Sequence, residues 1–176
     1  MSKYISYPKG GLAQVNDNPW QVIREPYQTA ETFVNGNFLI SYQDWIEHHA
    51  PSENRTAPSF GVYFSVEDDV FEERQRIKRY MHQWQVIAVD FPIFRDGRGF
   101  STAAILRETF MWDKELIAIG DVLIDQLIQL SRVGFDGFVL RDDQHLAHGV
   151  SQLSRFPVKM QNDWRGLKTQ RSAECV

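Results

Sequence analysis

Short apolar runs alternate with amphipathic stretches through the middle of the chain. The runs at 86–89 and 116–119 are continuously apolar, which is typical of strands buried on both faces. After the second run, Leu123, Leu127 and Leu130 recur at helical spacing, and Gly134 then favours a helix end. Strands and helices that alternate with short links indicate parallel βαβ units.

This pattern predicts about five strand–helix pairs. Strands are expected at 38–40, 60–64, 86–89, 116–119 and 138–140, and helices at 42–49, 65–83, 101–112, 121–133 and 142–153. We therefore predict an α/β fold with an open, mainly parallel sheet of about five strands and helices on both faces. A partial TIM-like barrel is the alternative, because the last units are so compact.

The domain is expected to span residues 33–156. Residues 1–32 are rich in Gly, Pro, Asn and Gln and are interpreted as an N-terminal arm with a few aromatic anchors. Residues 157–176 are mostly polar and are interpreted as a C-terminal tail.

Composition excludes several classes of protein. A formal net charge of -4 argues against nucleic acid as a partner. The chain starts without the apolar run of a signal peptide and has no run long enough to span a bilayer, so we expect a cytoplasmic protein without a membrane partner. The single cysteine, Cys175, excludes an internal disulfide.

The loop after the apolar run at 86–89 is the leading candidate for a binding site. Gly97 and Gly99 would let a ligand approach the main chain, and the helix start that follows favours an anion. Arg98 supplies a guanidinium suited to phosphate, sulfate or carboxylate, and Ser101 could cap the helix or contact the ligand. In the alternative interpretation this segment is only a tight turn, with Arg98 paired to Asp96.

Polar residues near the carboxyl ends of the predicted strands give further candidates, because ligands of open α/β sheets bind there. Asp90, Asp125 and Arg141 are candidates for one common rim. Asp96 or Asp121 would act as the acid or base if the protein is an enzyme. Asp121 is equally explained as a helix cap, and Asp125 as part of a solvated helix face.

No cofactor or metal is expected from motifs. The sequence has no dinucleotide-binding or Walker motif, no pair of closely spaced cysteines and no iron–sulfur spacing. His145 and His148 are three residues apart near Asp142 and could bind a metal, but no third and fourth ligand is obvious, and an exposed helix face explains them just as well.

Four segments together resemble the bacterial domain of unknown function 934. They are FPIFRDGRGFS at 91–101, LR at 106–107, AIGDVLIDQL at 118–127 and RVGFD at 132–136. The family is described as a probable oxidoreductase component of sulfite reduction, so the resemblance implies a role in sulfur assimilation. Two positions depart from the family pattern: Ile117 stands where a basic residue is common, and Val133 where a cysteine is common.

Three hypotheses follow. The first is a non-catalytic accessory that docks on a sulfite reductase subunit or binds a small sulfur or phosphate oxyanion, because the sequence lacks the groups that redox chemistry needs. The second is a small enzyme acting on a phosphorylated or sulfated metabolite. The third is a structural domain that forms a homodimer.

Overall fold

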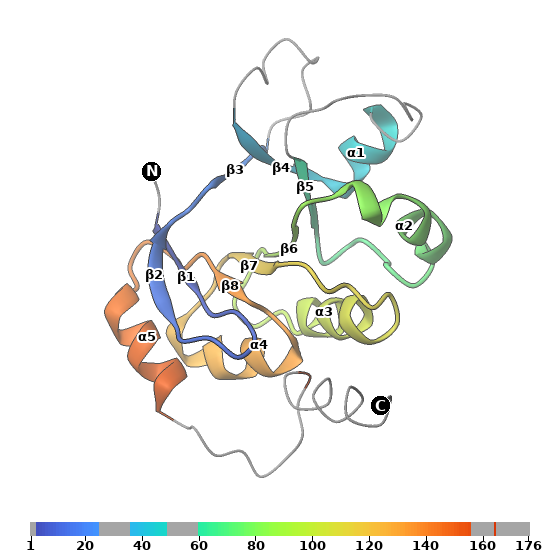
Figure 1. Cartoon of the computed structure of the whole chain (residues 1–176). Coiled ribbons are helices and arrows are strands. Elements are labelled where there is room, and N and C mark those ends of the chain that lie inside the picture. The colour runs from blue at the N-terminus through green and yellow to red at the C-terminus, as the bar shows by residue number, and fades with distance from the viewer. Residues whose placement is uncertain (1–2, 25–35, 49–59, 156–163, 165–176) are drawn as a thin grey trace.

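The computed structural model describes residues 3–24, 36–48, 60–155 and 164, which form one sheet with helices around it (Figure 1). The strands are β1 (Lys3–Ser6), β2 (Gln14–Asp17), β3 (Trp20–Val22), β4 (Asn37–Ser41), β5 (Phe60–Phe64), β6 (Ile87–Phe91), β7 (Leu116–Gly120) and β8 (Gly137–Phe138). The α-helices are α1 (Tyr42–His48), α2 (Arg74–Tyr80), α3 (Arg98–Glu108), α4 (Leu127–Val133) and α5 (Leu146–Ser154). None of these described helices is both long and apolar enough to cross a membrane.

The sheet is larger and less uniform than the sequence predicted. Its eight strands lie in the order β2-β1-β8-β7-β6-β5-β4-β3. Strands β3 to β8 are parallel, whereas β1 is antiparallel to β8 and β2 is antiparallel to β1. The prediction of about five strands is wrong because residues 3–22, interpreted as an arm, supply three more. In the hairpin formed by β1 and β2, Ile5 is completely buried, whereas every residue of β2 is exposed. This segment therefore has no strong apolar pattern.

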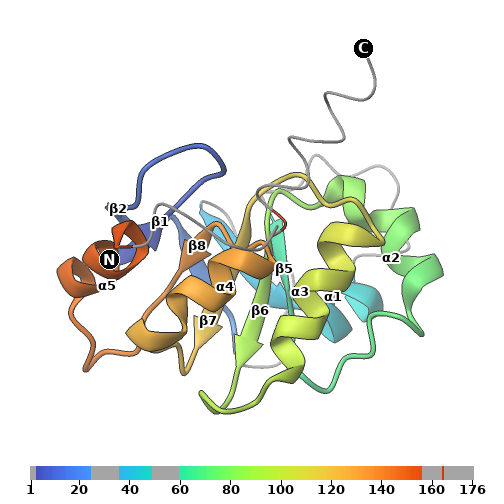
Figure 2. The same ribbon diagram turned by 90° about the horizontal axis from the view of Figure 1, so that it is seen from below.

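The sheet curls into an open half-barrel with its helices on the outer face (Figure 2). One core cluster contains buried side chains from all five α-helices: Trp45 of α1, Ile77 of α2, Leu106 of α3, Leu127 of α4 and Leu153 of α5. The prediction of helices on both faces is therefore wrong, and the architecture follows the alternative of a partial barrel. The physical reason is that each short βα unit returns on the same side, which curls the sheet.

The inner, concave face carries a second and smaller apolar cluster. Leu39, Tyr63, Ala88, Ile117 and Ile119 belong to it, and each alternates along its strand with a residue of the helix-facing core. Ile117, one of the two positions discussed in the sequence comparison with the family, is completely buried here. Its apolar side chain therefore belongs to this inner cluster.

Helix α2 begins at Arg74 rather than near Ser65. The acidic residues expected in its first turn instead close local turns: Asp69 accepts hydrogen bonds from the amides of Phe71 and Glu72. Asp68 likewise accepts from the amide of Ser65 at 2.7 Å. Side chains of this kind compete with the helix for backbone hydrogen bonds, which explains the shorter helix.

Candidate functional site

The candidate residues gather at the carboxyl ends of β6, β7 and β8. Asp121, just after β7, links three segments at this rim. Its amide donates to the carbonyl of Phe91 at 2.7 Å, its Oδ2 accepts from the amide of Phe94 at 2.9 Å, and its Oδ1 accepts from Arg141 at 2.8 Å. Asp121 therefore fastens the loop after β6 to the segment after β8.

Arg98 is held by two carboxylates. Its Nη2 lies 2.7 Å from Asp96 Oδ2 and 3.0 Å from Glu67 Oε1, and its Nε also donates to Asp96. These hydrogen bonds from Arg98 hold the pKa of Asp96 below its usual value. The pairing with Asp96 is that of a tight turn, and a ligand anion would have to compete with both carboxylates for the guanidinium.

The two glycines of this loop differ in their surroundings. Gly97 has φ -77°, and no atom of the described residues lies within 4 Å of the point that a Cβ would occupy, so neither its conformation nor its space requires glycine. At Gly99 a Cβ would lie 2.5 Å from the ring of Phe91, so glycine permits close packing of α3 on β6. Because α3 begins at Arg98, Ser101 lies inside the helix and is not its cap.

Arg141 is paired in the same way as Arg98. It donates to Asp121, and its Nε and Nη2 donate to Asp143 at 2.7 and 2.8 Å. The hydrogen bonds from Arg141 lower the pKa of Asp143 to about 2. Arg141 therefore pairs with two aspartates of the rim.

The two remaining candidates lie apart from this network. Asp90 is nearly buried and accepts two hydrogen bonds from Arg24, at 2.7 and 2.8 Å. Arg24 also lies 6.0 Å from the centre of the Tyr63 ring, and no motif of the sequence marks it as a site residue. Asp125 is exposed in the 3-10 turn Ile124–Gln126, where the neighbouring Gln126 makes the contact to the rim by donating to the carbonyl of Phe94.

Three consecutive side chains project from the loop after β6, and no motif of the sequence marks them as site residues. Ile93 is 49% exposed and Phe94 is 41% exposed. Arg95 is exposed too, and no described residue forms a hydrogen bond or ion pair with its side chain. Their backbone is fixed, because the amide and carbonyl of Phe94 are both bonded and the amide of Asp96 donates to the carbonyl of Ile93 at 3.0 Å. We call Ile93, Phe94 and Arg95 the rim triplet.

Comparison with known protein families shows which family the chain belongs to. The pattern of a family described as bacterial protein of unknown function (DUF934) matches residues 61–170. The chain belongs to this family. The match covers all but the first residue of β5, all of β6 to β8 and the loops that follow them, which confirms the resemblance seen in the sequence. A search of curated proteins finds no match.

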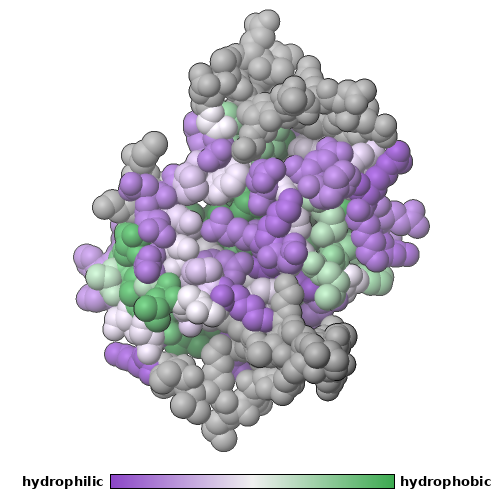
Figure 3. All heavy atoms as spheres, in the orientation of Figure 1, coloured by the Kyte–Doolittle hydropathy of each residue, from purple (hydrophilic) through white to green (hydrophobic). Residues whose placement is uncertain are grey.

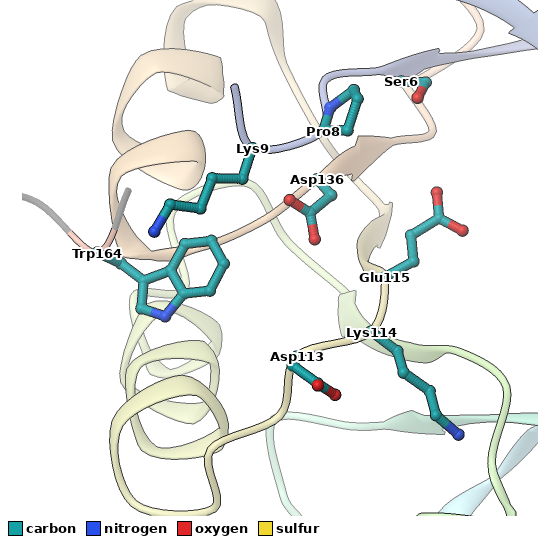
Figure 4. Close-up of a pocket in the computed structure, with 8 residues that line it drawn as sticks. All are labelled: Ser6, Pro8, Lys9, Asp113, Lys114, Glu115, Asp136 and Trp164. Atoms are coloured by element: carbon teal, nitrogen blue, oxygen red, sulfur yellow. The ribbon is translucent and has the colours of Figure 1, made fainter. Parts of the chain in front are cut away.

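This DUF934 protein has a hollow at the opposite, amino-terminal ends of β7 and β8 (Figure 4). Its volume is about 350 Å³, and Trp164 and Lys9 lie on one side with Glu115 and Lys114 on the other. The Tyr4 hydroxyl donates to Glu115 Oε1 at 3.3 Å. Burial raises the pKa of Glu115, and the nearby charge of Asp136 adds to the effect. The hollow is separate from the rim and shares no residue with it.

The Glu115→Gln substitution is expected to change how the stability of the DUF934 protein depends on pH. Because the pKa of Glu115 is raised in the folded state, the folded protein binds this proton at a higher pH than the unfolded chain. The contribution of Glu115 is most favourable below the ordinary value of 4.5 and is lost as the pH rises through the folded value.

Glutamine does not titrate, so the parent protein should lose stability relative to Glu115→Gln as the pH rises above the ordinary value of 4.5. Urea unfolding of both proteins at several pH values measures this difference. A difference that does not change with pH would contradict the assignment.

In the ranges that the structure describes, no group of three or more His, Cys, Asp or Glu side chains is arranged to hold a metal ion. His145 and His148 instead pack edge to face, with ring centres 5.4 Å apart. Each ring therefore has the other as its neighbour at the start of α5.

Proposed function

We propose that this DUF934 protein is a non-catalytic accessory of sulfite reduction, which docks on a sulfite reductase subunit through the rim triplet. The observation that carries the docking role is the exposure of Ile93, Phe94 and Arg95 on a backbone held by hydrogen bonds. Aromatic and arginine side chains are enriched among residues that dominate binding energy. A fixed backbone lowers the entropy lost on binding. The choice of partner rests on the role in sulfite reduction that the sequence resemblance implies.

The charges of the rim favour docking over binding of a small oxyanion. Each of Arg24, Arg98 and Arg141 already donates to at least one aspartate at 2.8 Å or less. An anionic metabolite at this loop would have to displace a carboxylate. Asp96 and Asp121 are themselves engaged as acceptors, which makes them poor candidates for an acid or base.

The docking proposal is tested by titrating the purified chain into a sulfite reductase hemoprotein subunit and measuring the heat of binding. We expect a complex with the parent protein. Phe94→Ala should weaken it by about 30-fold, which corresponds to a loss of about 2 kcal/mol at a binding hot spot. Arg95→Glu should weaken it as well, since it reverses the charge of an exposed contact.

Phe71→Ala is the matched control, because Phe71 is 52% exposed just before α2 and lies outside the rim. Its affinity should equal that of the parent protein. Absence of any complex at about 50 µM, or equal losses in Phe71→Ala and Phe94→Ala, would overturn the proposal.

A further inference from the structure

We infer that β2 is the contact between two copies of this chain, which pair their edge strands antiparallel across a twofold axis. The inference is independent of the proposed docking at the rim. Strand β2 lies at one end of the sheet order and, among the described strands, pairs only with β1 (Figure 1). Its outer side therefore presents backbone groups that are available to another strand.

The register of the hairpin shows which backbone groups point outward. The amide of Tyr7 donates to the carbonyl of Asp136 at 2.6 Å, continuing the ladder in which Ile5 lies opposite Phe138. In an antiparallel ladder the hydrogen-bonded pairs alternate, so Ile5 uses its N–H and C=O toward β8. Its even-numbered neighbours Tyr4 and Ser6 therefore face β2.

The same alternation applies to β2. Tyr4 lies opposite Asn16 and Ser6 opposite Gln14, so these two residues of β2 bond to β1. Val15 lies opposite Ile5 in a pair without hydrogen bonds, and its N–H and C=O consequently point off the sheet edge. Asp17, two residues on, points the same way.

The outward strand is complementary to itself. A twofold axis at Val15 places the two Val15 residues opposite each other, where they exchange two backbone hydrogen bonds, and places Gln14 opposite Asn16. Asp17 then lies opposite Ala13 of the other copy, so no like charges meet. This self-complementarity favours a second copy over a foreign strand, and twofold dimers are the commonest closed assemblies.

The residues on and around β2 favour contact with a second copy over exposure to solvent. Leu12 is 77% exposed and Val15 is 40% exposed, and hydrophobic side chains are visible on this side of the molecule around β2 and α5 (Figure 3). Natural proteins keep edge strands unpaired by making them very short, or with charged side chains (lysine above all), prolines or bulges. The four-residue strand β2 has no lysine or proline, and its register with β1 runs without a bulge. Its one charged side chain, Asp17, lies opposite Ala13 in the paired arrangement.

Sedimentation equilibrium of the full chain tests the inference. We expect a reversible dimer of the 20.5 kDa chain. Val15→Pro removes an outward N–H without removing a hydrogen bond to β1, and should raise the dimer dissociation constant at least about tenfold while leaving the melting temperature of the monomer nearly unchanged. Val15→Lys, which places like charges opposite each other, should have the same effect.

Gln21→Lys is the matched control, because Gln21 is an exposed residue of β3 at the opposite edge of the sheet. It should leave the dimer intact. A parent protein that stays monomeric up to about 200 µM would overturn the inference. So would a dimer that survives both substitutions at Val15, or one that only Gln21→Lys disrupts. Pairing of β2 with a strand of another protein, without self-association, would also overturn it.

Discussion

Replacement of Arg107 by methionine is expected to lower the free energy of unfolding by about 4 kcal/mol, because it leaves several buried acceptors without a donor. The side chain of Arg107 is completely buried in the last turn of α3. It donates to the carbonyls of Gly134 at 2.8 Å, Trp112 at 2.6 Å and Lys114 at 2.8 Å, and it pairs with Asp136. One guanidinium thus joins the helix to the segments that enter β7 and β8.

Urea unfolding followed by circular dichroism measures this loss. For a chain of this size the melting temperature should fall by roughly 10 °C. Arg76→Met is the matched control, since its side chain is 61% exposed and its partner Glu73 lies at 3.3 Å on the surface. That change should cost less than about 1 kcal/mol. A similar small effect at Arg107 would show that the acceptors find other donors.

The strands that the sequence predicted well are those whose stability comes from local apolar runs. Residues 60–64 form β5 with the predicted bounds, and the runs at 86–89 and 116–119 fall in β6 and β7 with small shifts. All five residues of β5 and of β6 are buried, and all but Gly61 and Asp90 among them are hydrophobic, so local hydrophobicity marks both strands. Gly134 ends α4 with φ 115°, as its place after the helix predicted.

Strands β1 to β3 could not be found in the same way, because long-range pairing decides their conformation. Strand β1 pairs with β8, more than 130 residues away in the sequence, through Ile5 and Phe138. Strand β2 is exposed along its whole length, so it shows no periodic apolar signal. The curvature of the sheet could not be predicted from any single segment either, because it arises from how successive βα units pack.

The candidate site at the rim was also predictable only in part. Its location after β6, β7 and β8 could be predicted, because parallel strands end at one edge. The pair of Arg98 with Asp96, two residues away, was one of the interpretations of the sequence, but the long-range ion pairs could not be predicted. Arg24 reaches Asp90 across 66 positions, and Glu67, in the turn between β5 and α2, contacts Arg98 of the more distant helix α3. The exposure of Ile93 and Phe94 was also hidden, since apolar side chains ordinarily indicate burial.

Gly120→Ala is expected to destabilise the protein by about 3 kcal/mol, because this glycine holds the rim in a conformation that alanine rarely adopts. Gly120 has φ 92° and lies opposite Phe91 in the register of β6 and β7. A Cβ there would lie 2.6 Å from Oδ1 of Asp90 and still closer to the carbonyl of Phe91. That carbonyl accepts from the amide of Asp121, so the clash would loosen the residue that fastens the rim.

Gly97→Ala is the matched control within the same rim. Gly97 has φ -77° and no described atom close to the point that a Cβ would occupy, so the change should alter stability by less than about 1 kcal/mol. Thermal unfolding of both variants, together with hydrogen exchange at the Asp121 amide, distinguishes the effects of the two substitutions. We expect faster exchange of the Asp121 amide in Gly120→Ala alone. Of the two glycines, only Gly120 has a positive φ, and only there would a Cβ clash with backbone atoms. Equal stability and equal exchange in the two variants would contradict this assignment of roles.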